Sequence, residues 1–154
     1  MKANPTIGLA LSGGGIRGVA HLGVLKALEE RKIPIHQLAG VSAGSIVGAL
    51  YASGYSADEI LDMVKKISAF RLFQPALNFK GLLKIEVIKK FLREYIKVDD
   101  FSALKIPLTV GATNLTYGRT DYFHEGSLID PICASSCVPV LFDPMLIGDQ
   151  WYID

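Results

Sequence analysis

The sequence predicts an α/β fold in which helices cover a mostly parallel sheet. Two observations support this prediction. Short apolar segments alternate with helix-length segments in the first third of the chain, and such alternation is typical of parallel strands joined by helices. The chain has 154 residues, and half of them are hydrophobic, which is enough for one core and about one domain. The connections between the parallel strands are expected to be right-handed.

The N-terminal half carries the alternation. Residues 6–12 form a short, nearly continuous apolar run, which predicts a strand buried on both faces. Residues 19–31 carry leucines at helical spacing and end in charged residues, and Pro34 confirms that this helix has stopped. A second short strand is expected at 38–41. It is followed by a buried helix at 43–53, because that segment is small and apolar throughout.

A capping box predicts the next helix, with Ser56 as its N-cap and Glu59 three residues later. Residues 84–97 have one apolar face and one charged face, which predicts an amphipathic helix. The remaining expected elements are a helix at 127–135, which contains Pro131, and strands at 107–115, 119–123, 145–147 and 151–153.

The charge and hydropathy of the chain narrow the classes of function. The formal net charge is +1, so no overall field attracts nucleic acid or steers an acidic substrate. No run reaches the roughly 18 apolar residues that a membrane-spanning helix needs. We therefore expect a soluble, cytoplasmic protein that does not bind nucleic acid. Peripheral contact with a membrane stays open, and so does the oligomeric state.

The two cysteines do not form a disulfide framework. Cys133 and Cys137 are four residues apart, which would place both on one helix face, where a disulfide would constrain little. We interpret them as small buried residues in a reducing compartment. His21, His36 and His124 share no ligand spacing with them, so no metal site is expected.

The segment Gly40-Val41-Ser42-Ala43-Gly44 matches the G-x-S-x-G pattern. A short apolar strand precedes it and a buried helix follows it, which is the context of a nucleophile held on a sharp turn. Glycines on both sides remove the Cβ atoms that would clash in such a turn. A Ser42 hydroxyl at this place would lie near the positive end of the helix dipole. The pentapeptide alone does not distinguish a nucleophile from a serine that caps the helix.

A glycine loop lies between the first strand and the first helix. Its backbone N–H groups could converge on an anion, and two functional interpretations compete. In acyl transfer the loop would be an oxyanion hole. In dinucleotide binding Gly13, Gly15 and Gly18 would satisfy G-x-G-x-x-G. The second interpretation requires a carboxylate about 20 residues later to hold the ribose, and this sequence has none there. The residues of the loop singled out as candidates are Gly13, Gly14, Gly15, Arg17 and Gly18.

Taken together, these motifs resemble those of the patatin-like phospholipase family. The match consists of Gly-Gly-Gly-Ile-Arg-Gly at 13–18, Gly-Val-Ser-Ala-Gly-Ser at 40–45 and Ala-Ser-Ser-Cys-Val-Pro-Val-Leu-Phe at 134–142. Residues 21–25 are similar to the family's first helix. Residues 151–154 are similar to the approach to its Asp-Gly-Gly or Asp-Gly-Ala motif. The resemblance covers essentially the whole chain.

The resemblance implies a three-layer α/β/α sandwich and a Ser-Asp dyad. By that resemblance Ser42 attacks the ester carbonyl and Asp154 accepts its proton directly. Gly14, Gly15 and Arg17 would supply backbone donors for the oxyanion. The substrate would be a lipid acyl ester, as for a phospholipase A, a lysophospholipase or an esterase, and no metal or cofactor is needed. Such a dyad requires an aspartate that burial makes more basic.

The chain ends at Asp154, where the family continues. We therefore expect residues 1–154 to be the N-terminal, incomplete part of a patatin-like phospholipase domain. A catalytically inactive fragment that retains lipid binding is one alternative, and a nucleotide-binding module is another. An ordinary α/β-hydrolase is disfavoured because Ser42 lies early and any late histidine would lie beyond the end of the chain.

Residues 70–83 are rich in large apolar side chains, with a proline and a glycine among them. Either they form a mobile cap that dips into a lipid surface, or they form a loop packed over the core. The head group, the acyl length and the position of attack are not determined by the sequence.

Overall fold

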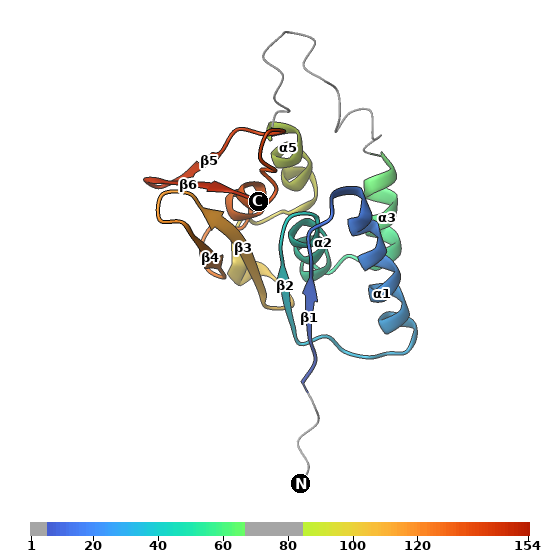
Figure 1. The fold of residues 1–154 in the computed structure, drawn as a ribbon. Helices are drawn as coiled ribbons and strands as arrows, with labels where there is room; N and C mark the ends of the chain where they lie inside the picture. Colours follow the sequence, from blue (N-terminus) through green and yellow to red (C-terminus); the bar gives the residue numbers. More distant parts are fainter. Residues whose placement is uncertain (1–5, 67–84) are drawn as a thin grey trace.

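The first three strands pair in parallel and build the centre of the fold. The computed structural model describes residues 6–66 and 85–154 (Figure 1), and the expected cap or loop at 70–83 lies outside them. β1 (Gly8–Leu11) pairs with β2 (Gln37–Gly40), and β2 pairs with β3 (Leu108–Asn114). The sequence therefore predicted this part of the sheet correctly.

The remaining strands pair antiparallel. β4 (Arg119–Phe123) and β6 (Gln150–Ile153) both run against β3, and β5 (Met145–Ile147) runs against β6. Because short connections link β3 to β4 and β5 to β6, these neighbours must reverse direction. The sheet is therefore mixed, and the expectation of a mostly parallel sheet holds only for β1, β2 and β3.

β2 and β6 lie along the same edge of β3. Val110 of β3 is paired with both β2 and β4, and Thr113 is paired with both β4 and β6. β4 therefore occupies one edge of β3, and the other edge is shared by β2 and β6. Since β2 runs parallel to β3 and β6 runs antiparallel to it, the carboxyl ends of β2 and β6 point toward each other. This topology brings Ser42, just after β2, and Asp154, directly after β6, to the same place.

The helices pack on one face of β1 and β2. Leu11 and Leu38 point from these strands into the core, whereas Ala10 and Ala39 on the opposite face are exposed. Among the described residues no helix covers that opposite face. Of the three expected layers, the described residues therefore contain the sheet and the helical layer on one side. The main helices are α1 (Val19–Glu30), α2 (Ala43–Ala52), α3 (Ala57–Lys66), α5 (Glu86–Tyr95) and α6 (Ile129–Ser135).

α2 is the helix at the centre of the core. It contacts β1, β2 and β3, and most of its residues are buried, as its small apolar composition predicted. α1 packs against α3, and α5 packs against α6. The capping box before α3 is confirmed, because Ser56 N–H donates to the Glu59 carboxylate at 2.8 Å and Glu59 N–H donates to the Ser56 hydroxyl at 3.3 Å.

α6 is shorter than the helix expected at 127–135, since it begins at Ile129. The Asp99 carboxylate accepts the N–H groups of Leu128 and Ile129, at 2.9 and 2.7 Å, and so fixes the start of the helix. Pro131 lies in the first turn, where a missing N–H removes no helical hydrogen bond. Asp99 therefore fixes the start of α6, which packs against β3.

None of the helices in residues 6–66 and 85–154 combines the length and the apolar composition needed to cross a membrane.

Candidate active site

Ser42 lies on a sharp turn between β2 and α2. Its backbone has φ 52° and ψ −128°, a conformation that costs energy for any residue other than glycine. The glycines on both sides make the turn possible. A Cβ added at Gly40 would lie 2.7 Å from the Gly44 carbonyl oxygen, and one added at Gly44 would lie 2.1 Å from that of Leu11. The sequence thus specifies a strained strand–turn–helix geometry, which serine nucleophiles adopt in other hydrolases.

The Ser42 side chain points toward the end of β6. It is only 6% exposed, and its hydroxyl donates a hydrogen bond to Oδ2 of Asp154 at 2.5 Å. Ser42 occupies the N-cap position of α2, but its side chain makes no capping hydrogen bond. The hydroxyl is therefore directed at a carboxylate 112 residues away in the chain and is not used to cap the helix.

Asp154 is held by its own backbone as well as by Ser42. Its N–H donates to the Cys137 carbonyl at 3.0 Å. Partial burial raises the pKa of the Asp154 carboxyl above its ordinary value, and the hydrogen bond from Ser42 opposes part of that rise. A carboxylate with a raised pKa is a better proton acceptor than an aspartate in water.

Two further buried serines hold the backbone of Ser42. Ser42 N–H donates to the Ser135 hydroxyl at 2.8 Å, and that hydroxyl donates to the Gly111 carbonyl at 2.6 Å. The Ser45 hydroxyl donates to the Ser42 carbonyl at 2.6 Å. Ser135 lies in one of the three motifs, yet nothing in the sequence assigns it a role. Its partners come from distant parts of the chain.

The glycine loop lies directly against the turn that carries Ser42. A Cβ at Gly13 would lie 3.1 Å from the Ser42 Cβ, and one at Gly18 would lie 2.6 Å from the Ala43 Cβ. Within residues 6–66 and 85–154, the N–H groups of Gly13, Gly14 and Gly15 have no hydrogen-bond acceptor. These N–H groups are therefore free to donate to an anion.

Arg17 does not fit the expectation of a free backbone donor. Its N–H donates to the Gly14 carbonyl at 3.0 Å, within the 3-10 turn Gly15–Gly18. The Arg17 N–H is occupied because each N–H in a 3-10 helix bonds to the carbonyl three residues earlier. The Arg17 side chain is exposed. The predicted set of donors is therefore corrected at this position.

Ala43 offers a donor that we did not single out from the sequence. It directly follows Ser42 and begins α2, and the part of the chain that the structure describes contains no acceptor for its N–H. In hydrolases with a nucleophile on such a turn, the N–H of the residue after the serine contributes to the oxyanion hole. That rule applied to the G-x-S-x-G pattern would have identified Ala43.

His21 anchors the start of the glycine loop. Its Nε2 lies 2.8 Å from the Ser12 carbonyl oxygen, and since a carbonyl only accepts, this nitrogen carries the proton. The bond fixes the direction of the Ser12 carbonyl directly before Gly13. His21 therefore contributes to the shape of the loop although it does not reach Ser42 by any hydrogen bond.

The described residues contain no cluster of three or more His, Cys, Asp or Glu that could hold a metal ion. Cys133 and Cys137 are both buried and free. Burial raises the pKa of the Cys133 thiol to about 12 and that of Cys137 to about 11. Both thiols stay protonated at neutral pH, and protonated thiols are poor metal ligands.

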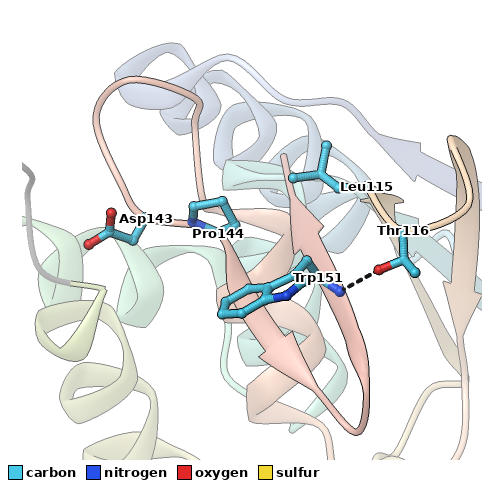
Figure 2. A pocket seen from close by; sticks show the side chains of 5 residues that line it. All are labelled: Leu115, Thr116, Asp143, Pro144 and Trp151. Carbon is cyan, nitrogen blue, oxygen red and sulfur yellow. Dashed lines mark hydrogen bonds between the residues drawn. The ribbon is translucent and has the colours of Figure 1, made fainter.

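A depression of about 480 Å³ lies beside the β5–β6 hairpin (Figure 2). It is lined by Leu115, Thr116, Asp143, Pro144 and Trp151. Trp151 N–H donates to the Thr116 hydroxyl at 3.0 Å on one side of it. None of these residues hydrogen-bonds to Ser42 or Asp154. The hydrogen bonds around Ser42, and not this cavity, therefore identify the candidate site.

Comparison with known proteins places these features in a family context. A family model for patatin-like phospholipases matches residues 9–154. An uncharacterized NTE family protein of Mycobacterium tuberculosis is 36% identical over 156 residues, which cover 99% of this chain and 43% of that protein. Lysophospholipase NTE1 of Kluyveromyces lactis is 53% identical over 158 residues, which cover 96% of this chain and 11% of that protein. The chain thus spans less than half of the length of these relatives.

Two solved structures share the fold. VipD from Legionella pneumophila superposes with a TM-score of 0.75 at 17% sequence identity, over 99% of this chain and 46% of that one. ExoU from Pseudomonas aeruginosa, in its complex with SpcU, superposes with a TM-score of 0.61 at 20% identity, over 86% of this chain and 38% of that one. At these identities the likeness concerns the fold.

Proposed function

This chain belongs to the patatin-like phospholipase family, and we propose that it hydrolyses lipid acyl esters with Ser42 as nucleophile and Asp154 as general base. The observation that carries the proposal is the 2.5 Å hydrogen bond from the Ser42 hydroxyl to the Asp154 carboxylate. A serine becomes nucleophilic when a nearby base takes its proton as it attacks. Here the carboxylate contacts the hydroxyl directly, with no histidine between them.

The reaction proceeds in two halves. Ser42 Oγ bonds to the ester carbonyl carbon while Asp154 takes the hydroxyl proton. The bond to the alcohol then breaks, and the alcohol leaves with that proton. Water attacks the acyl-Ser42 ester with Asp154 again as base. The fatty acid leaves, and the proton returns to Ser42 Oγ.

The developing oxyanion is stabilised by backbone donors. The N–H groups of Gly13, Gly14, Gly15 and Ala43 have no acceptor among the described residues, and Gly13 and Ala43 lie next to Ser42. Removal of one such donor typically costs about 3 kcal/mol of transition-state stabilisation. The positive end of the α2 dipole adds to this effect, since the helix begins at Ala43.

The substrate is a glycerolipid acyl ester, in the manner of a phospholipase A or a lysophospholipase. The family description and the likeness to the lysophospholipase of Kluyveromyces lactis support this choice. Release of fatty acid from lysophosphatidylcholine and from phosphatidylcholine by the full-length protein tests it. We expect hydrolysis of at least one of the two and its loss in Ser42→Ala. Hydrolysis retained in Ser42→Ala, or hydrolysis of neither lipid, would contradict the proposal. Ser53→Ala is the matched control, because Ser53 only donates to a carbonyl at the far end of α2.

Peripheral contact with a lipid surface is a further part of the proposed function. Ile16, on the glycine loop, is 73% exposed, and Val140, three residues after Cys137, is 87% exposed. Both apolar side chains belong to segments that hold the site. Insertion of two such side chains into lipid contributes about 1.5–3 kcal/mol each.

Sedimentation with phosphatidylcholine vesicles tests the contact. We expect the Ile16→Asp, Val140→Asp double variant to bind at least about tenfold more weakly than the wild type. Val98→Asp changes an apolar side chain that is 58% exposed and lies outside these segments, and it should bind normally. If both variants bind the vesicles equally well, Ile16 and Val140 do not form the lipid contact.

A further inference from the structure

The carboxyl end of α6 holds both members of the Ser42–Asp154 pair. The Ser135 hydroxyl accepts the N–H of Ser42 at 2.8 Å, and two residues later the Cys137 carbonyl accepts the N–H of Asp154 at 3.0 Å. We propose that Ser135 is a positioning residue whose buried hydroxyl keeps Ser42 in the strained conformation from which it reaches Asp154. The inference deepens the proposed hydrolysis and rests on it.

Both hydrogen bonds of the Ser135 hydroxyl serve this task. The side chain is completely buried. Its one hydroxyl proton goes to the Gly111 carbonyl of β3 at 2.6 Å, which leaves the oxygen lone pairs for the N–H of Ser42. A single hydroxyl therefore links α6, the central strand and the nucleophile turn. Because β3 is the strand that both β2 and β6 pair with, the turn is tied to the most constrained part of the sheet.

The conformation of Ser42 explains why such an anchor is needed. Its φ of 52° and ψ of −128° are sparsely populated, and they persist only where the surroundings impose them. A relaxed serine at this position would have an alternative use for its hydroxyl, since Ser is among the preferred N-cap residues. An anchor on the N–H of Ser42 opposes that relaxation because it fixes the peptide plane before the nucleophile.

The carbonyl side of Ser42 is held differently. Its oxygen accepts the Ser45 hydroxyl at 2.6 Å and the Ser45 N–H at 2.9 Å. Removal of the Ser45 hydroxyl therefore leaves a partner in place. The N–H of Ser42 has no second acceptor among the residues that the structure describes. The two serines should consequently differ in importance, with Ser135 the larger contributor.

Ser136 provides a matched control for the experiment. It is also buried, lies on the next residue, and donates its hydroxyl to the Ile132 carbonyl of the same helix at 2.8 Å. It makes no hydrogen bond to Ser42 or Asp154. Ser135→Ala and Ser136→Ala thus each delete one buried hydroxyl at the end of α6, and only the first touches the nucleophile.

We expect Ser135→Ala to lower kcat about 10- to 100-fold in the full-length protein, since small misplacements of a reacting group cost this much. KM should change less than about twofold, and the rate of fluorophosphonate labelling of Ser42 should fall with kcat. Ser136→Ala should keep kcat, while Ser45→Ala should fall between the two. The acidic limb of the pH profile should move to higher pH in Ser135→Ala alone, because Asp154 then loses the hydrogen bond that lowers its pKa.

If Ser135→Ala and Ser136→Ala lose kcat and melting temperature to the same extent, Ser135 has only a structural role, and the proposal is overturned. An unchanged kcat in Ser135→Ala would overturn it as well. If Ser135→Ala fails to fold, Ser135→Cys keeps the shape but forms weaker hydrogen bonds, and wild-type kcat in that folded variant would also overturn it. Fluorophosphonate labelling of the wild type separates failure of this proposal from failure of the proposed hydrolysis. If Ser42 is not the nucleophile, it remains unlabelled in the wild type as well.

Discussion

The two halves of the candidate site come from parts of the sheet that are built differently. Ser42 and the glycine loop follow parallel strands, and local glycines determine their geometry. Asp154 and Ser135 come from the antiparallel strand β6 and from α6, and contacts across the whole chain determine their positions. The nucleophile half, Ser42 with the glycine loop, therefore depends on backbone shape. The base half, Asp154 with Ser135, depends on how well β6 and α6 are anchored.

Gly44→Ala should break the nucleophile half most completely. The new Cβ would lie 2.1 Å from the Leu11 carbonyl oxygen, and backbone atoms must move to relieve such a clash, at a cost of about 1–3 kcal/mol or more. We expect a lower melting temperature and no labelling by a fluorophosphonate. Gly23→Ala is the control, since a Cβ there meets nothing within 4 Å, and it should be neutral or stabilising. Normal labelling of a stable Gly44→Ala protein would refute the role of the turn.

Asp154→Asn tests the base half, and we expect it to lower kcat strongly, with an effect second only to that of Gly44→Ala. Loss of a general base typically lowers kcat about 10²- to 10⁴-fold. Burial disfavours the charged form of Asp154, so the neutral amide should leave the melting temperature unchanged or higher. Steady-state hydrolysis and thermal unfolding check both expectations. Hydrolysis near the wild-type rate would remove Asp154 from the mechanism.

His21→Ala should have a smaller effect, confined to the nucleophile half. The loss of its hydrogen bond to the Ser12 carbonyl loosens the glycine loop, and we expect kcat to fall several-fold, about 1 kcal/mol in the barrier. His36 is the control at the other end of β1, where its Nδ1 accepts the N–H of Ile7 at 3.0 Å. His36→Ala should keep kcat. Equal kcat in the two variants would show that the loop needs no such anchor.

Asn114→Ala should lower the stability of the base half. Of the four variants, we expect it to change activity least. The buried Asn114 amide donates to the carboxylate of Asp121 at 2.6 Å and to the Gln150 side chain at 2.7 Å, and so ties β3 to β4 and β6. Its loss removes both of these bonds and the acceptor of the Tyr117 N–H, and should cost about 1–3 kcal/mol of stability. Thermal unfolding measures this cost. A stability equal to that of the wild type would mean that other contacts hold β6.

The sequence predicted the nucleophile half of the site more fully than the base half. Glycines and a strand–turn–helix pattern specify the Ser42 turn within a few residues, so local chemistry suffices there. Asp154 could be assigned only through a family motif, because its distance to Ser42 depends on β6 pairing antiparallel with β3. Ser135 lies in a recognised motif, but its role could not be inferred from the sequence. Its hydrogen-bond partners Ser42 and Gly111 are remote from it along the chain. The occupied N–H of Arg17 depended on a 3-10 turn that periodicity does not reveal.

The pH dependence of Ser42 labelling reports on the direct contact between the Ser42 hydroxyl and the Asp154 carboxylate. The rate of fluorophosphonate labelling is measured across the acidic range for full-length wild type and Asp154→Asn. Only the ionised carboxylate accepts the Ser42 proton, so the wild-type rate should fall as the pH drops through the pKa of Asp154. Because burial raises that pKa, the fall should lie above the range of an ordinary aspartate. Asp154→Asn should label slowly and without this acidic limb. Identical rates and profiles for the two proteins would exclude Asp154 as the base that activates Ser42.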